Sequence, residues 1–311
     1  MKKLLLSVVA LMASVTLWAQ DLPALYNEGV AAFQKKDFTT AIAKFAEVVE
    51  LGEEAEEAEE LVGNAGKNLA MCYYRMAGGM AQQKKFTESL DMCEKGLEVA
   101  KDYNKAYTAK FNGMKSKVYM VLGGEKINAK DFAGAVEFLE KGVECSPRNV
   151  KLQNMLAMSY CESGKFVEGM EVYEQVAKND NPKYAAEVEQ AKKDMALYTN
   201  NEIAKLQAAQ DFDGMLAMAE SLLEKNAESA LGLSIRVQAY NGKKDFAKVL
   251  ELGEAAAAAQ VDDEGKSAIY FIIGCVYNEQ KQPEKAIAAF SKVTAGPNVQ
   301  NAQAAIAGLK K

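Results

Sequence analysis

One short phrase recurs along the chain and constrains its fold more than any other feature. Lys36-Asp37-Phe38, Lys130-Asp131-Phe132 and Lys244-Asp245-Phe246 are its full copies. Variants of the phrase stand at Lys85-Phe86, Lys165-Phe166, Asp211-Phe212 and Gln282-Pro283. Self-similarity at a period of roughly 20 to 50 residues indicates similar units stacked in a row. The sequence therefore predicts seven structural units.

Each copy of the phrase is flanked by segments with the periodicity of an α-helix. Ala41, Phe45 and Val48 follow the first copy and lie on one face of a helix. Before the phrase, a second helical segment carries a small residue mid-way, such as Gly29. The chain has 5 prolines among 311 residues, and few of its β-branched residues alternate with polar ones, which favours helices throughout. We expect an all-α chain of antiparallel helix pairs.

Small residues on facing helices let the two helices of a pair approach closely, and an aromatic fills the remaining gap. We expect the phrase aromatics, such as Phe132 and Phe166, to hold the interiors of the units. One pair cannot bury its apolar stripe alone, whereas stacked pairs bury a continuous core.

This arrangement resembles the tetratricopeptide repeat, whose first helix carries a bulky residue, Leu-Gly and an aromatic, and whose second helix carries Ala-x3-Phe. The copy that keeps the family spacing best has Tyr270, Ile273, Gly274, Tyr277, Ala286 and Phe290. Gly169 and Met215 depart from the family, which has a small Ala there. The resemblance implies a right-handed α-solenoid, a TPR-like superhelix of about seven repeats, over residues 20–311. A final helix from Asn298 to Leu309 is expected to cap it.

The spacing between successive phrases is uneven, with steps of 48, 46, 34, 46, 34 and 37 residues. Three steps carry about a dozen extra residues, which is roughly 18 Å of helix. They fall at 52–68, 101–114 and 181–194. We expect elongated helices that project past the stack, with a split at Gly63, Gly66 or Gly113 as the alternative.

The first nineteen residues are typical of a secretory signal peptide. Lys2 and Lys3 precede a mostly apolar run from Leu4 to Ala19, too short to span a bilayer. We expect cleavage near Ala19 and an exported protein, periplasmic or associated with the outer membrane, with no membrane-spanning segment in the mature chain.

The composition argues against catalysis. The chain contains no histidine, which removes Ser-His-Asp and Cys-His chemistry and the commonest metal ligand. No phosphate-binding or dinucleotide-binding glycine motif is present. We expect no catalytic residue, no metal and no cofactor. The run of glutamates from Glu50 to Glu60 lacks the spacing of a calcium loop and is interpreted as a solvated helix face.

Five cysteines are distributed without the spacing of a zinc site: Cys72, Cys93, Cys145, Cys161 and Cys275. An odd number leaves at least one unpaired in a monomer, and the expected helix positions do not bring pairs to disulfide distance. We expect free, buried thiols.

The charge balance narrows the partner class. Removing Lys2 and Lys3 from the 37 basic residues leaves 35 against 43 acidic ones, a net charge of −8. Nucleic acid needs a concentrated basic face, so we expect protein or peptide partners and no nucleic acid.

The resemblance implies that a partner peptide or helix binds in a concave groove lined by the first helix of each pair. Its positions are Tyr26, Val30, Phe33, Met71, Tyr74, Met120, Asn154, Met158, Asn200, Ser234, Gln238, Phe271 and Asn278. Because the N-terminal positions are more apolar and aromatic, they are expected to carry the affinity; the alternative is that Phe33 and Tyr74 merely pack repeat against repeat.

The function expected from this resemblance is a non-catalytic scaffold or adaptor of a bacterial cell envelope. Self-association into a structural subunit of an envelope complex is the alternative, and hydrolysis of an envelope polymer is a weaker one.

Cleavage of the signal peptide would lower the mass of the mature protein by that of the removed residues. Mass spectrometry of the protein from its native host should find a species that begins near Gln20 and lacks the apolar run. A species that still begins at Met1 would contradict the expected export.

Overall fold

The computed structural model describes residues 21–53 and 55–310, and every regular element in this part of the chain is a helix. The signal peptide expected at residues 1–19 lies outside the described residues. The remainder divides into two compact units. The first unit comprises residues up to 129 together with 137–149, and the second comprises 130–136 together with 150 onward.

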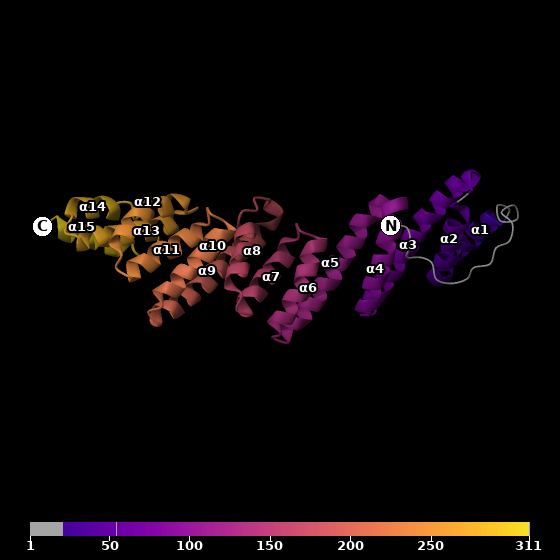
Figure 1. Cartoon of the computed structure of the whole chain (residues 1–311), viewed down its shortest axis with the longest axis horizontal. Coiled ribbons are helices and arrows are strands. Elements are labelled where there is room, and N and C mark those ends of the chain that lie inside the picture. Colours follow the sequence, from indigo (N-terminus) through magenta and orange to yellow (C-terminus); the bar gives the residue numbers. More distant parts are fainter. Residues whose placement is uncertain (1–20, 54, 311) are drawn as a thin grey trace. The chain divides into compact units, whose positions relative to one another are not determined.

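In the first unit, consecutive helices pack against each other and run in opposite directions (Figure 1). Its elements are α1 (Leu22–Gln34), α2 (Phe38–Gly52), the 3-10 turn η1 (Glu56–Ala58), α3 (Glu59–Gln82), α4 (Phe86–Tyr103) and α5 (Lys105–Asn128). Helix α6 (Phe132–Cys145) contributes its first turn to the second unit and the rest to the first.

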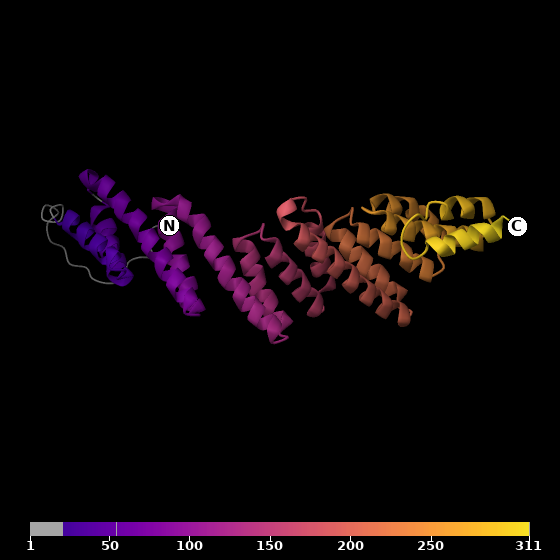
Figure 2. The ribbon, with the colours of Figure 1, turned by 180° about the vertical axis from the view of Figure 1, so that it is seen from behind.

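The second unit repeats the same arrangement, as the rear view shows (Figure 2). Its elements are α7 (Val150–Glu162), α8 (Phe166–Ala177), the 3-10 turn η2 (Pro182–Tyr184), α9 (Ala185–Ala208), α10 (Phe212–Lys225), α11 (Ala230–Gly242), α12 (Phe246–Ala259), α13 (Asp263–Glu279), α14 (Pro283–Phe290) and α15 (Val299–Leu309). Each unit is thus a stack of antiparallel helix pairs, and the all-α fold class predicted from the sequence is confirmed.

The turn between the two helices of every pair has one backbone geometry. Two residues before each phrase aromatic, or before Pro283, φ lies between 53° and 85°. The residues in this left-handed conformation are Lys36, Lys84, Lys130, Gly164, Gln210, Lys244 and Lys281. In this conformation the chain reverses and the next N–H groups return to the carbonyls of the last helical turn. Asp245 N, for example, donates to Tyr240 O at 2.9 Å, and Gln282 N to Tyr277 O at 2.9 Å.

The aspartate of the phrase starts the second helix of its pair. The side chain of Asp37 accepts a hydrogen bond from Thr40 N at 3.1 Å, and that of Asp211 accepts one from Gly214 N at 2.7 Å. Asp131 and Asp245 make the same contact with the residues three positions ahead. An N-terminal aspartate satisfies one of the free N–H groups of the first helical turn, which stabilises the helix by about 1 kcal/mol.

In several pairs a small residue meets a large one near the middle. A methyl group added to Gly29 would lie 2.8 Å from the Phe45 ring, and one added to Gly274 would lie 2.5 Å from the Phe290 ring. The same two positions are buried in all seven pairs. They hold Gly29/Phe45, Ala77/Cys93, Gly123/Leu139, Ala157/Tyr173, Ile203/Ala219, Val237/Gly253 and Gly274/Phe290. Where the first helix carries the larger residue, the second carries Ala or Gly.

The phrase aromatics do not fill the interiors, and this expectation was wrong. Each of the six phenylalanines is the first residue of its helix and is half-buried. The fully buried rings come seven residues later, as at Phe45 and Tyr173. A residue at the first helical position lies at the end of the pair, where it covers the core and keeps one edge in solvent. Phe38 does this by packing edge-on against Phe33, with ring centroids 5.7 Å apart.

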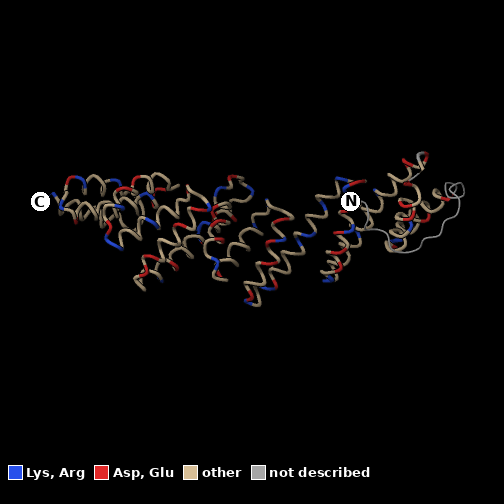
Figure 3. The backbone as a smooth tube through the Cα atoms, in the orientation of Figure 1, with Lys and Arg blue, Asp and Glu red and all other residues tan. Residues whose placement is uncertain are grey.

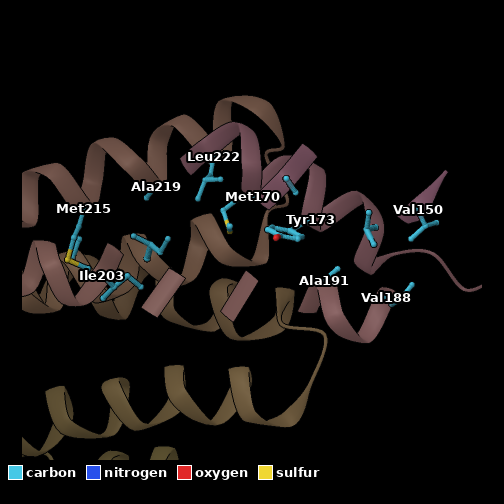
Figure 4. Close-up of a cluster of buried hydrophobic side chains, with 13 residues drawn as sticks. Val150, Met170, Tyr173, Val188, Ala191, Ile203, Met215, Ala219 and Leu222 are labelled. Atoms are coloured by element: carbon cyan, nitrogen blue, oxygen red, sulfur yellow. The ribbon is translucent and has the colours of Figure 1, made fainter. Parts of the chain in front are cut away.

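The three elongated helices are present: α3, α5 and α9 each have 24 residues and run unbroken through Gly63, Gly66 and Gly113. Their extra turns pack rather than project. Phe111 is 0% exposed in the extra part of α5. Figure 4 shows Val188 and Ala191 of α9 in the same buried cluster as Tyr173 of α8. The added length extends the core of the preceding pair, which corrects the expectation that these segments stand free.

Helix α15 closes the second unit at its C-terminal end. Ala302 is buried, and Val299, Ile306 and Leu309 pack around Phe290 and Val293. The apolar side expected of a capping helix is confirmed.

Truncating Phe45 and truncating Phe38 should lower the free energy of unfolding by different amounts. Phe45→Ala removes a fully buried ring and should lower the free energy of unfolding by about 3 to 5 kcal/mol. Phe38→Ala removes a half-buried ring and should cost clearly less. Chemical denaturation of both variants measures the difference, and equal losses would contradict the assignment of Phe45 to the interior. Hydrogen exchange should show the loss concentrated in neighbouring pairs.

Candidate interaction surface

The predicted groove residues share one side of the first helix of each pair, although some positions on that side, such as Ile235, are buried. We define the A face as the residues 15, 12, 11, 8, 5 and 4 positions before each phrase aromatic or Pro283, which share one side of the helix. The predicted groove residues all lie at these positions. The first unit presents the A faces of α1, α3 and α5, and the second unit those of α7, α9, α11 and α13.

In the first unit, the predicted aromatic positions are also structural. The Tyr26 ring lies 5.6 Å from the Phe45 ring, and its hydroxyl accepts a hydrogen bond from Asn68 Nδ2 at 3.1 Å. Tyr74 packs edge-on against Tyr107 and Phe111, at 5.5 and 5.6 Å. Both tyrosines are half-buried, so only part of each ring faces solvent.

The remaining predicted residues of the first unit also pack partly against the core. Val30 and Phe33 pack against the cluster around Phe45. Met71 and Met120 are half-buried. The contacts required by the packing alternative for Phe33 and Tyr74 are therefore present, and truncating either residue would change the core as well as the surface.

In the second unit, the predicted positions are mostly polar and several are free of the core. Asn200 and Asn278 are exposed, and Met158 is half-buried. Gln238 Nε2 donates to Ser234 Oγ at 3.2 Å. Phe271 packs against Phe290 with ring centroids 5.6 Å apart.

Asn154 holds the extra turn of α9 in place. Its Nδ2 donates to the carbonyl of Glu187 at 2.8 Å. Asn154, which was expected to face a partner, is thus bound to the elongated helix α9. This contact depends on the fold and has no signal in the sequence pattern.

Leu197 of α9 and Val121 of α5 are exposed A-face residues that were not among the predicted groove positions. Leu197 is 55% exposed, one of few large aliphatic side chains left in solvent among the described residues, with Val121 and Val261. Leu197 stands where the extra turns of α9 meet the regular repeat, next to exposed Asn200 and Asn201. Its position, 15 residues before Phe212, matches that of Met71 before Phe86 and could have identified it.

The A faces carry little charge. In the first unit, Arg75 and Lys117 are the charged residues at A-face positions; in the second they are Lys151, Glu162 and Glu279. Charged residues make up 26% of the chain and occur along both units (Figure 3). A surface from which charge is depleted, and which offers half-exposed apolar groups and amides, is typical of a protein-binding face.

The cysteines are free. Burial raises the pKa of Cys72, Cys93 and Cys161 to about 12, so these thiols are protonated and unreactive near neutral pH. Burial also raises the pKa of Cys145 and Cys275. Cys145, Cys161 and Cys275 are only half-buried, so the expectation of buried thiols holds for Cys72 and Cys93 alone.

The described residues contain no group of three or more His, Cys, Asp or Glu side chains arranged to hold a metal ion. None of the helices in this part of the chain combines the length and the apolar character needed to cross a bilayer.

Comparison with known proteins identifies one repeat directly. Residues 267–295, which cover most of α13, all of α14 and the turn after it, match the family profile of the tetratricopeptide repeat. The resemblance read from the sequence is confirmed there. The other pairs share the turn geometry of this repeat and bury the same two mid-pair positions. No curated protein matches the sequence.

Solved structures similar to this chain include several tetratricopeptide-repeat proteins. The TPR2AB domain of yeast Sti1, solved with pHSP90, is 14% identical, with 94% of this chain and 100% of that chain covered and a TM-score of 0.32. A tetratricopeptide repeat protein from Parabacteroides merdae is 12% identical, with coverage of 94% and 100% and a TM-score of 0.29. Yeast Tom70 is 15% identical, with coverage of 88% and 59% and a TM-score of 0.34.

Thiol labelling tests the burial of the cysteines. At pH 8 the native protein should react with a thiol reagent first at Cys145 and Cys275, while Cys72 and Cys93 react only after unfolding. The reason is that a thiol whose pKa lies near 12 has almost no thiolate at pH 8. Peptide mapping by mass spectrometry assigns each site, and rapid labelling of Cys72 in the native state would contradict the buried core.

Proposed function

We propose that the protein is a non-catalytic scaffold that binds a partner peptide or helix on the A faces of its repeats. The observation that carries the proposal is the depletion of charge on these faces, combined with exposed Leu197, Asn200 and Asn201 on α9. The family match of residues 267–295 supports it, because stacked repeats of this kind present extended surfaces for protein partners.

Each kind of A-face side chain has a role in such binding. An exposed leucine provides apolar area that is lost from water when a partner covers it. Asparagine and glutamine side chains offer both donors and acceptors, so they can pair with the main-chain groups of an extended segment. Small Ala204 and Ala208, exposed on the same side of α9, leave room for the partner's backbone to approach.

The proposal includes the cellular location of the protein. The apolar N-terminal run after Lys2 and Lys3 supports export, and we propose an adaptor that works in a bacterial cell envelope.

A pair of matched substitutions tests the A face. A partner is first isolated from envelope extract on the immobilised protein, and its affinity is then measured for Leu197→Asp and for Val261→Asp. Val261 is a similar aliphatic side chain, 87% exposed, between α12 and α13 and off the A face. We expect Leu197→Asp to weaken binding at least tenfold, as loss of a central apolar contact does, and Val261→Asp to have little effect.

Equal effects of the two substitutions, with both variants folded, would exclude the A face of α9 as the binding surface. Circular dichroism and melting curves of each variant serve as the control for folding.

A further inference from the structure

The helices α1 to α4 of the first unit carry opposite charge at their two ends. Because consecutive helices run in opposite directions, the turns within the two pairs lie at one end, which we call the turn edge (35–38 and 83–86). The connections between pairs lie at the other end, the connector edge (50–60 and 101–105). Helix α3 has 24 residues and joins the two edges, so they lie about 36 Å apart. Figure 3 shows red at the start of α3 and blue at its end.

The turn edge is basic. Lys35, Lys36, Lys84 and Lys85 are all exposed there, against a single acidic residue, Asp37, whose carboxylate caps the start of α2. Among the described residues, none of the four lysines forms an ion pair. Their charge is therefore available to a group outside the chain.

The connector edge is acidic. Residues 50–60 hold seven glutamates and no basic residue. Glu57, Glu59 and Glu60 are exposed, and the described part of the chain places no ion-pair partner beside them. Residues 101–105 add one acidic and two basic residues, so the edge holds eight acidic against two basic ones. The two ends of the same helices are thus complementary in charge.

Each edge also has an apolar centre. On the turn edge, Phe38 and Phe86 are the first residues of α2 and α4 and are half-buried. On the connector edge, Leu51, Leu61 and Tyr103 are half-buried side chains of one apolar cluster. Ion pairs between exposed groups stabilise a contact little, whereas an apolar centre with a charged rim is typical of a protein interface. Charge and apolar area therefore occur together on both edges.

We propose that the turn edge of one copy of this chain docks on the connector edge of a second copy. The second copy supplies both the negative charge and the apolar area that the lysines and phenylalanines of the turn edge lack. Since the two edges lie at opposite ends of the same helices, the contact is head-to-tail, and each bound copy leaves one edge free for the next. The contact uses helix ends and leaves the A faces uncovered, so it does not depend on the function proposed for them.

Light scattering of the purified protein tests whether copies associate. At an ionic strength of about 0.01 M we expect the average mass to rise with protein concentration. At about 1 M it should fall to that of the monomer, because salt screens exposed charges. A mass that stays monomeric at both ionic strengths would overturn the proposal.

Charge reversal on each edge tests which residues make the contact. The lysine variant carries Lys35→Glu, Lys36→Glu, Lys84→Glu and Lys85→Glu, and the glutamate variant carries Glu57→Lys, Glu59→Lys and Glu60→Lys. In each variant the two edges resemble each other in charge, so each alone should associate about tenfold more weakly or less. When the two variants are mixed, each offers the other an edge of opposite charge, and the association should return.

A matched control changes the net charge equally in the second unit. It carries substitutions of four exposed lysines, Lys178→Glu, Lys192→Glu, Lys225→Glu and Lys281→Glu. The control should associate like the unaltered protein. An equal loss in the control would contradict the proposal, as would a mixture that stays monomeric although circular dichroism shows both variants folded. If the glutamate variant does not fold, the three glutamates are changed to Gln instead, and unchanged association of that variant would also contradict it.

Vesicles that contain phosphatidylglycerol test the other occupant that a basic edge could take. If the protein stays monomeric while the vesicles bind it and do not bind the lysine variant, the turn edge is a lipid-binding surface. The proposed contact between copies then fails.

Discussion

The buried contact between a small and a large residue at the middle of a helix pair, as between Gly29 and Phe45, is the interaction on which the rest of the structure depends. At Gly29 and at Gly274 even a methyl group would overlap the facing ring. The size of the two residues sets how close the helices lie, and closely packed interiors do not tolerate a void or an extra methylene at such a point. At Gly253 an added methyl group would instead meet Ile273 of α13, so the close contact there lies between neighbouring pairs.

This contact can recur only because the turn of each pair is constant. A left-handed residue followed by an N-terminal side chain, as at Lys244 and Asp245, ends one helix and starts the next in three residues. The two facing positions then stay sixteen residues apart in every pair, whatever the lengths of the outer helix ends. Extra residues are accepted only where one pair connects to the next, where α3, α5 and α9 lengthen and extend the preceding core.

Much of this fold could be predicted from the sequence, because helical periodicity and a recurring phrase are local signals. The number of pairs, the long helices and the cap at Val299–Leu309 followed from them. The recurring phrase also led to one wrong prediction, that its phenylalanines fill the interior. Phe38 and Phe132 look like core residues because they recur, whereas their place at the first helical position leaves them half-buried. The packing of α9 against Asn154 and the meeting of Glu162 with Tyr198 could not be predicted, since they depend on how consecutive pairs stack. The A-face positions could be predicted from the sequence. Which of these side chains also pack into the core could not.

Extended repeat surfaces bind partners without a pocket or a catalytic group. Repeats that use their interiors for stability leave the A faces free to differ, and here these faces have few charges. The two facing residues should contribute to the free energy of unfolding in a coupled way, because each must fit the size of the other. A double-mutant cycle at Gly274 and Phe290 tests this most directly. Gly274→Ala, Phe290→Leu and the double variant are compared by chemical denaturation. A coupling on the order of 0.5 to 3 kcal/mol, with the smaller ring relieving the added methyl, is predicted. Additive losses within a few tenths of a kcal/mol would contradict it.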